Sequence, residues 1–437
     1  MFKVAKFGGS SVANAEQFKK VKQIAESDKE RKFIVTSACG KESHEDHKVT
    51  DLLYLLREHI RYGVSYEEIL GMVESKYRRI KEALGLKLDL ESEFAEIRSH
   101  LDRNVETDYL VSRGEYLTAL CLAEYLDAEF VDAADFMAFN YDGSFDFVKI
   151  KELFGKRIQT DKKIVIPGFY GFLPNGRIKV MTRGGSDISG AVIANIVSAD
   201  VYENWTDVSG FLVTDPRIVN DPLTIPFMNY SELREMSYMG ANVLHDDAVF
   251  PVRMKGIPIN IRNTNDPDNP GTLILEDCSE YDKISPPHCI TGITGKKDFS
   301  VLTVIKSHSS TEVGFLKKIL TVLEDFNISI ECAPITVDTF SVIVQTRAFE
   351  GQIYDIIERI KREIKPDEIY VEDGLALIDL VGRGLKSARG VAGSLLSELG
   401  RNDVNVKILN TGSDEHSLMV GIDAKDLETG IRCIYNR

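Results

Sequence analysis

Three glycine-bearing polar turns each follow a β-like segment, and each carries side chains that suit phosphate or carboxylate chemistry. They are Lys6-Phe7-Gly8-Gly9-Ser10-Ser11, Thr182-Arg183-Gly184-Gly185-Ser186-Asp187, and the stretch from Trp205 to Arg217. Adjacent glycines let the backbone approach a ligand and aim amide groups at it, and a following helix N-terminus adds positive potential. Jointly, the turns predict a crevice for a nucleotide and a co-substrate in an open α/β sheet.

The first turn alone is weak evidence. Lys6 supplies a mobile charge that suits phosphate. The turn is neither a Walker loop, which ends in Gly-Lys-Ser/Thr, nor a GxGxxG fingerprint. By itself it is better interpreted as a tight strand-to-helix connection with a surface lysine, and only the combination of three turns is specific.

The elements that would position these turns alternate along residues 1–290. Short β-like runs and amphipathic helical stretches there predict an α/β domain with a mainly parallel central sheet flanked by helices. Strands are expected at residues 33–36, 129–131, 163–166 and 200–202. A helix is expected from Asn14, capped with Gln17, and its apolar face would be Phe18, Val21, Ile24 and Ala25. Residues 65–126 are expected to form a helical insertion whose many charges make a solvated face.

Beyond a Pro-, Asp- and Asn-rich segment at 266–285, with one short strand at 272–275, the sequence repeats itself. The second copy follows at an offset of 76 residues, so that Gly314-Phe315-Leu316 matches Gly390-Val391-Ala392. Each copy predicts a strand, a glycine-containing loop, a helix and two further strands, the first of these two at 327–330 and 403–406. We therefore expect a catalytic domain at 1–290 and two small α+β domains at 291–366 and 367–437.

Composition limits the kinds of partner. The 437 residues carry a net charge of -15 and are 43% hydrophobic, which indicates a globular protein and disfavours nucleic acid and anionic membranes as ligands. The six cysteines form no CxxC pair and are expected to be reduced. The sequence starts without a cleavable apolar segment and has no apolar run of about 18 residues, so we expect a cytoplasmic protein.

Four segments carry a family resemblance. The KFGGS start, Val111-Ser112-Arg113-Gly114-Glu115, the RGGSD turn and the WTDV…TDPR segment resemble the aspartate kinases of the amino acid kinase family, and the repeated tail resembles their paired ACT domains. The resemblance covers essentially the whole chain, in the same order. It implies transfer of the ATP γ-phosphate, with Mg2+, to the β-carboxylate of L-aspartate. The product would be 4-phospho-L-aspartate, the first step toward lysine, threonine and methionine.

This resemblance, with the residue types, assigns the catalytic roles. Lys6 and Asp187 are the expected catalytic residues. Lys6 and the amides around Gly8, Gly9 and Ser10 would face the transferred phosphate, and Asp187 would orient that cluster or the Mg2+.

Substrate and nucleotide positions are assigned in the same way. Glu115 would bind the ammonium of aspartate, Arg183 its α-carboxylate as a fork, and Thr50 matches a family position that contacts aspartate. Thr206, Asp207, Arg217 and Val243 match nucleotide-contacting positions. Two nucleotide positions depart from the family pattern: Leu212 replaces the usual Tyr, and Asn242 replaces the usual Lys. The lost positive charge at Asn242 predicts weaker ATP binding or an altered nucleotide preference.

The tail is expected to sense an amino acid, because the glycine loop and helix start of each repeat expose amides suited to a carboxylate. The first copy has Glu331 where the second has Lys407, and an acid there could accept the side-chain ammonium of lysine. The expected effector contacts are Gly314, Phe315, Leu316, Ser329 and Glu331. Lysine is the favoured effector and threonine the second candidate. Glu331 also fits an ordinary solvent-facing strand position, and the family has Asp there. Paired ACT domains imply a homodimer or larger.

Other interpretations remain open at this point. Residues 41–48 bring two His and three acids together, but a flexible loop near the substrate explains them better than a metal site. For the whole chain, the alternatives are another acidic amino-acid kinase, such as a glutamate or acetylglutamate kinase, and a noncatalytic amino-acid sensor that keeps the fold.

Overall fold

The computed structural model describes residues 2–43, 45–158, 161–182, 184–240, 244, 246–284, 290–385, 388–411 and 417–436. The chain divides into two compact units. Unit 1 comprises residues 1–211, 224–230 and 242–280, and unit 2 comprises residues 212–223, 231–241 and 281–437. No helix in the described ranges is long and apolar enough to cross a membrane.

Unit 1 is built on an eight-stranded sheet with the order β3-β4-β2-β1-β7-β9-β10-β8. Its strands are β1 Lys3–Phe7, β2 Arg31–Thr36, β3 Glu129–Phe130, β4 Ile164–Pro167, β7 Val201–Thr206, β8 Phe227–Asn229, β9 Ile259–Asn263 and β10 Thr272–Leu275. Every neighbouring pair is parallel except β9 and β10, which confirms the mainly parallel sheet. A separate hairpin joins β5 Tyr170–Phe172 and β6 Ile178–Val180.

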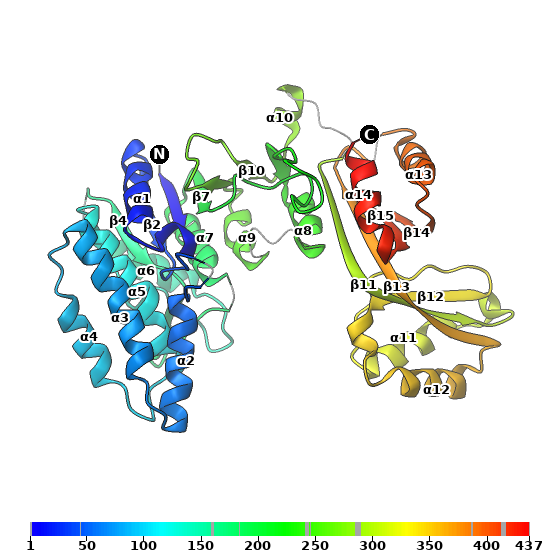
Figure 1. Cartoon of the computed structure of the whole chain (residues 1–437), viewed down its shortest axis with the longest axis horizontal. Helices are drawn as coiled ribbons and strands as arrows, with labels where there is room; N and C mark the ends of the chain where they lie inside the picture. The colour runs from blue at the N-terminus through cyan, green and yellow to red at the C-terminus, as the bar shows by residue number, and fades with distance from the viewer. Residues whose placement is uncertain are drawn as a thin grey trace. The chain divides into compact units, whose positions relative to one another are not determined.

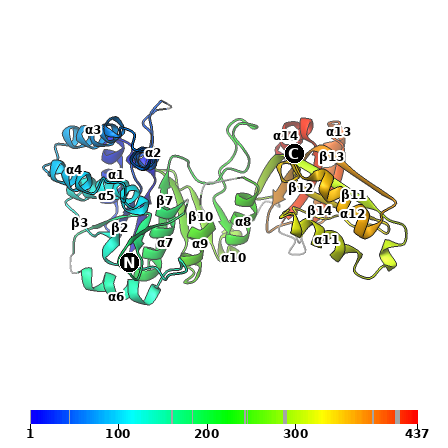
Figure 2. The same ribbon diagram turned by 90° about the horizontal axis from the view of Figure 1, so that it is seen from below.

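Helices cover both faces of this sheet. They are α1 Ala15–Ser27, α2 Val49–Tyr62, α3 Glu67–Leu84, α4 Leu90–Ser99, α5 Thr107–Tyr125, α6 Phe147–Arg157, α7 Gly185–Val197 and α9 Asp246–Arg253. Figure 2 shows α1 to α5 on one face and α6, α7 and α9 on the other. The cap of α1 is as expected: the side chain of Asn14 accepts the Gln17 amide at 3.1 Å, and the four predicted apolar residues are buried.

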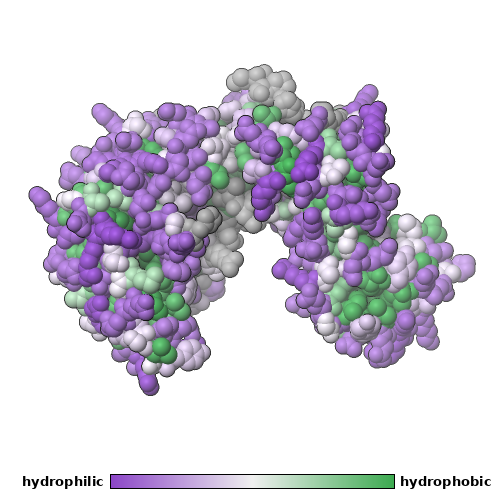
Figure 3. Space-filling model, viewed as in Figure 1, coloured by the Kyte–Doolittle hydropathy of each residue, from purple (hydrophilic) through white to green (hydrophobic). Residues whose placement is uncertain are grey.

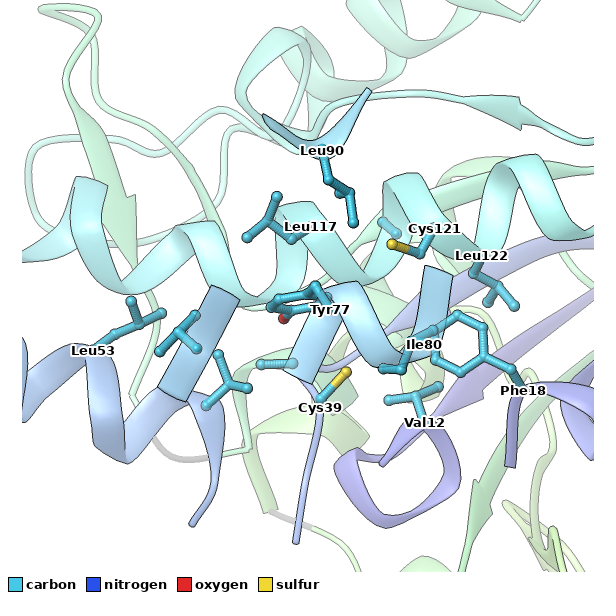
Figure 4. Packing of buried hydrophobic residues seen from close by; sticks show 14 of the residues in the cluster. Val12, Phe18, Cys39, Leu53, Tyr77, Ile80, Leu90, Leu117, Cys121 and Leu122 are labelled. Atoms are coloured by element: carbon cyan, nitrogen blue, oxygen red, sulfur yellow. The ribbon is translucent and has the colours of Figure 1, made fainter. Parts of the chain in front are cut away.

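The core on the first face packs α1, α2, α3 and α5 together. Tyr77 of α3 and Leu117 of α5 belong to it, and Figure 4 shows them with Cys39, from the connection after β2, and Phe18 of α1. Cys39, Cys121, Cys332 and Cys433 are free thiols. Most charged side chains of residues 65–126 are exposed or half-buried, as expected, whereas four of them, Glu74, Lys76, Arg113 and Glu115, are no more than 8% exposed.

Unit 2 contains one five-stranded antiparallel sheet with the order β12-β11-β13-β15-β14 (Figure 1). The strands are β11 Gly292–Ile305, β12 Thr339–Gln345, β13 Glu368–Val381, β14 Val406–Thr411 and β15 Ser417–Asp423. The helices are α11 Phe315–Asp325, α12 Ile353–Ile364, α13 Val391–Arg401 and α14 Leu427–Tyr435, while α8 Tyr230–Tyr238 and α10 Ser279–Ile284 lie mostly in this unit.

The two sequence repeats share their longest strands. The first part of β11, Gly292–Lys296, pairs with Leu377–Val381 of β13, whereas Phe299–Ile305 pairs with β12 and with the start of β13. Ile293 accordingly packs in the core with α13 and α14, and Leu302 in the core with α11 and α12. The strand expected at 327–330 does not form, since these residues follow α11 as a turn and an irregular segment. The two cores thus share β11 and β13, while the domain boundaries at 290 and 366 stay a prediction.

Candidate active site

The functional residues of unit 1 collect where four parallel strands end. Because β1, β2, β4 and β7 are adjacent and parallel, their carboxyl ends lie at one edge of the sheet. The first glycine turn follows β1 there and continues as a short 3-10 helix, Gly9–Val12. α7 starts at the same edge, where Gly168, just after β4, contacts Ser186 so closely that a Cβ would lie 2.9 Å from its Cα. The first two predicted turns therefore meet.

Lys6, Asp187 and Asn204 form a polar cluster at this edge. Lys6 of β1 is paired in register with Asn204 of β7, and its Nζ forms an ion pair with Oδ1 of Asp187. Nζ also donates to Oδ1 of Asn204 at 3.2 Å, and Nδ2 of Asn204 donates to Oδ1 of Asp187 at 2.9 Å. Lys6 and Asn204 are only 7% and 2% exposed, so the ammonium is held in one position.

The cluster lies directly beside the glycine turn. A Cβ on Gly8 would be 3.5 Å from Nζ of Lys6, and the Gly8 amide donates to the Trp205 carbonyl at 3.0 Å. Among the described residues, the amides of Gly9 and Ser10 have no backbone acceptor. Unpaired amides at a helix start, next to a fixed ammonium, can bind an anion such as phosphate.

Glu115 places a buried carboxyl group in the same region. It lies in α5, is 4% exposed, and its Oε2 has no hydrogen-bond partner among the described residues. Burial raises the pKa of Glu115 to about 8, although the Ala38 amide hydrogen-bonds the carboxylate. A buried carboxylate with an unpartnered oxygen is costly unless a cation or donor joins it. Glu115 therefore suits a ligand that brings an ammonium.

Gly114 lets side chains at the start of α2, where Thr50 lies, pack directly against α5. A Cβ on Gly114 would be 2.9 Å from Cβ of Ala38 and 3.1 Å from Cγ1 of Val49, the first residue of α2. Only glycine allows α5 this close. Thr50 follows Val49 and is partly exposed.

The third turn is divided between the units. Thr206 ends β7, and its hydroxyl donates to Oδ1 of Asp207 at 3.2 Å. Leu212 and Arg217 belong to unit 2, where the 88%-exposed Arg217 side chain is bound to Asp215. The other predicted contacts, Arg183, Asn242 and Val243, lie outside the described residues, as does His44 of the 41–48 segment. No group of three metal-ligating residues occurs in the described ranges.

In unit 2 a cavity of about 330 Å³ opens at the start of α11. Gly314, Phe315 and Leu316 line it, as expected, whereas Ser329 and Glu331 are not among its lining residues. Oε2 of Glu331 instead accepts the Tyr238 hydroxyl at 2.7 Å, and Oε1 accepts Nε2 of Gln345 at 3.1 Å.

The surface beside this cavity is apolar. Val313, Ile335 and Val337 are 97%, 57% and 71% exposed. Figure 3 shows hydrophobic residues gathered over the part of the chain that carries α11 and α12. An exposed patch of this kind marks an interaction surface.

Sequence reasoning missed Asn204 and Lys76. The signal for Asn204 was present in the strand sequence Val201-Tyr202-Glu203-Asn204-Trp205. A polar side chain buried in such a strand needs a hydrogen-bond partner. Lys76 gives no such signal, since its charge lies in a helix rich in exposed charges.

Comparison with known proteins identifies the family of the chain. Residues 1–263 match the model of the amino acid kinase family, and residues 378–437 match an ACT domain. The chain therefore belongs to the amino acid kinase family. Aspartokinase 3 of Bacillus subtilis is 33% identical, over 99% of this chain and 98% of that protein. Aspartate kinase of Clostridium acetobutylicum is 42% identical with a TM-score of 0.90, over 100% of this chain and 99% of that one.

A further solved structure carries ligands. Escherichia coli aspartokinase III in complex with aspartate and ADP is 25% identical with a TM-score of 0.74, over 100% of this chain and 99% of that one. Within its family, then, the chain is an aspartate kinase, a phosphotransferase with an ACT regulatory module.

Proposed function

We propose that the chain transfers the γ-phosphate of ATP to the β-carboxylate of L-aspartate, giving 4-phospho-L-aspartate and ADP, at the sheet edge that holds Lys6, Asp187 and Glu115. A carboxylate oxygen attacks the γ-phosphorus, and the bond to the oxygen that bridges to the β-phosphate breaks. The observation that carries this proposal is the buried Oε2 of Glu115, which has no hydrogen-bond partner in the part of the chain that the structure describes and so suits the ammonium of an amino-acid acceptor.

The proposed chemistry needs charge stabilisation rather than a base. A β-carboxylate with a reference pKa of about 3.9 is ionised at neutral pH and needs no proton removed. The barrier lies in bringing this anion to a polyanionic phosphate, which positioned cations and amides lower. Lys6 and the amides of Gly9 and Ser10 would do so, with Asp187 and Asn204 fixing the ammonium, whereas the Gly8 amide is already bonded to the Trp205 carbonyl.

The aspartate acceptor would be bound through its ammonium and α-carboxylate groups. Glu115 would bind the ammonium, Arg183 the α-carboxylate, and Thr50 would contact the same molecule. Aspartate over glutamate is a one-methylene choice worth only about 1–3 kcal/mol.

Mg2+ fits the phosphate side of the site. Magnesium usually binds proteins through one or two carboxylates together with substrate phosphates. Asp187 is the candidate ligand, because its side chain stays 15% exposed while Oδ1 is engaged by Lys6 and Asn204. The ion would neutralise charge on the phosphates. The nucleotide itself would contact Thr206, Asp207, Leu212, Arg217, Asn242 and Val243.

Regulation would act through the first repeat. We assign the effector site to the cavity at Gly314, Phe315 and Leu316, with lysine the favoured effector; aspartokinase III of Escherichia coli was also solved with lysine and aspartate. The exposed apolar residues beside this cavity suit a homodimer or larger assembly. The pathway would lead to lysine, threonine and methionine. Free cysteines are consistent with a cytoplasmic enzyme.

The deciding experiment is a hydroxamate assay of acyl phosphate formation with ATP and each of L-aspartate, L-glutamate and N-acetyl-L-glutamate. We expect product with aspartate only, and none with Lys6→Ala. N-acetyl-L-glutamate lacks the ammonium and should not bind Glu115. Product with glutamate or its acetyl derivative would make the chain another acidic amino-acid kinase, and no product with any acceptor would make it a sensor.

A further inference from the structure

The connection between β2 and α2 passes directly over the glycine turn. Residues 40–48, of which all but residue 44 are described, leave after Cys39 and return at Val49, whose amide donates to the Cys39 carbonyl at 3.1 Å. We call this segment the 40–48 loop. At its start, the Gly40 amide donates to the Gly9 carbonyl at 2.9 Å. The loop thus joins the proposed phosphate turn to the helix that begins next to Thr50.

Gly40 and Gly9 meet backbone to backbone. A Cβ on Gly40 would lie 2.6 Å from C and O of Gly9 and 2.9 Å from the Ser10 nitrogen. On its other side, a Cβ on Gly9 would lie 3.1 Å from the Ala38 carbonyl oxygen. With so little free space, a displacement of Gly40 must displace the amides of Gly9 and Ser10.

One buried lysine fixes this loop at both ends. Nζ of Lys76, in α3, donates to the Gly40 carbonyl and to Oδ2 of Asp46, each at 2.6 Å. Oδ2 of Asp46 also accepts the Glu42 amide, and its Oδ1 accepts the His47 amide, both at 2.8 Å. The Lys76 side chain is only 3% exposed. Lysine is almost never this buried unless it is paired, which indicates that its position in the fold has a specific use.

The helix that carries Lys76 is itself held firmly. The adjacent Tyr77 is fully buried, and its hydroxyl donates to the Gly114 carbonyl of α5 at 2.7 Å. Figure 4 shows Tyr77 packed between α5 and Cys39. Gly114 directly precedes Glu115 in α5. The backbone of α3 at Lys76 is therefore fixed to the helix that supplies the proposed ammonium-binding carboxylate.

We propose that Lys76 is a positioning residue for phosphoryl transfer, which sets the 40–48 loop, through Gly40 and Asp46, so that the Gly9–Ser10 amides and Thr50 face their ligands. It acts through these groups and does not itself touch either substrate. The inference rests on the proposed transfer to aspartate.

The test compares Lys76→Met with Arg79→Met in steady-state assays of the full chain. Both variants remove a cation from α3 that reaches the same loop, but Arg79 contacts Glu42 at 3.3 Å from a side chain that is 66% exposed. A displacement of about 1 Å at reacting groups can cost on the order of 100-fold in rate. We expect Lys76→Met to lower kcat on the order of 100-fold and to raise KM for aspartate about 10-fold. Arg79→Met should stay within about 2-fold for both, as for an exposed ion pair.

KM separates positioning from folding, because it does not depend on the fraction of enzyme that is folded. Asp46→Asn should raise KM for aspartate in the same direction, and the double variant Lys76→Met/Asp46→Asn should be no worse than Lys76→Met alone. An unchanged KM, with kcat reduced only in proportion to the folded fraction, would show a purely structural lysine and overturn the inference. If wild-type protein forms no acyl phosphate from aspartate, the proposed function fails instead; if it does and Lys76→Met matches it, only this inference fails.

Discussion

The hydroxyl of Tyr238, at the end of α8, donates a hydrogen bond of 2.7 Å to Oε2 of Glu331 in the first repeat. Glu331 is the predicted partner for the ammonium of a lysine effector, so this bond competes with the predicted contact. α8 directly precedes residues 242 and 243, which are predicted to contact the nucleotide.

Tyr238→Phe should strengthen inhibition by lysine. The substitution removes the hydroxyl and leaves the Glu331 carboxylate free for an ammonium. A hydrogen bond to a charged group contributes roughly 1.5–3 kcal/mol, so we expect the inhibitory concentration of lysine to fall about 10-fold or more. Glu331→Gln should raise it. Equal inhibition of both variants and wild type, measured by ADP release, would exclude Glu331 as an effector contact.

Aspartate binding should release a proton. Because the pKa of Glu115 is raised to about 8, roughly nine-tenths of this carboxyl is protonated at pH 7 in the free enzyme. An ammonium beside it favours the ionised form and lowers that pKa. Calorimetric titration at pH 7 in buffers of different ionisation enthalpy should show about one proton released, and KM for aspartate should fall as the pH rises toward 8.

Glu115→Gln is the matched control for this proton. Its binding heat should not depend on the buffer. The wild-type carboxyl binds its proton more tightly in the folded state, so its contribution to stability is present below about pH 4.5 and is lost as the pH rises through about 8. The variant should therefore gain in Tm relative to wild type across this window. A constant difference in Tm would mean that Glu115 is already ionised in the free protein.

Asn204→Leu should reduce turnover without abolishing the fold. The change removes both the acceptor for Lys6 and the donor to Asp187, so the ammonium is no longer held beside Gly8. Loss of one such charged hydrogen bond, at roughly 1.5–3 kcal/mol, corresponds to a drop in kcat of about 10- to 150-fold. Thermal unfolding measured in parallel shows how much of any fall in kcat comes from a smaller fraction of folded enzyme. Wild-type kcat in a folded variant would mean that Asp187 alone fixes Lys6.

Arg31→Ala should destabilise unit 1 strongly. Arg31 and Glu203, 6% and 2% exposed, form a two-pronged pair, and the same carboxylate accepts the Trp205 indole at 2.9 Å. Removal of one partner leaves a buried charge unpaired, which costs about 3–5 kcal/mol. Trp205 is the single tryptophan, so urea unfolding followed by its fluorescence reports this unit directly. The double variant Arg31→Met/Glu203→Leu should recover most of the lost free energy of unfolding. Unchanged stability in Arg31→Ala would contradict the assignment of Arg31 and Glu203 as a stabilising buried pair.

Much of unit 1 could be predicted because its signals are local. The capping pair at Asn14, the β-branched runs and the glycine turns each depend on a few neighbouring residues. The convergence of the turns followed from the rule that parallel strands share a carboxyl edge. Lys76 could not be found in this way, since only tertiary packing distinguishes it from the exposed charges around it.

The tail was harder to predict because two of its strands each run from one hydrophobic core into the other. Sequence similarity located the matching loops and helices, but it cannot show that β11 and β13 each serve both halves of one sheet. The missing strand at 327–330 has a related cause. Asn327 adopts a positive φ of 54° immediately after α11, and the segment that follows makes only isolated bridges to β12, at Cys332 and Ile335.

The continuity of β11 and β13 has a mechanical consequence for the sensor. Each is a run of 14 residues that passes from one core into the other, so the core that contains α13 and α14 also needs Gly292–Lys296 and is not a contiguous fragment of the sequence. A chain truncated at residue 367 would leave Gly292–Lys296 without Leu377–Val381, the part of β13 with which it pairs. A displacement of one core on amino-acid binding would therefore be transmitted to the other core through the backbones of β11 and β13. The two halves of the tail would then move together.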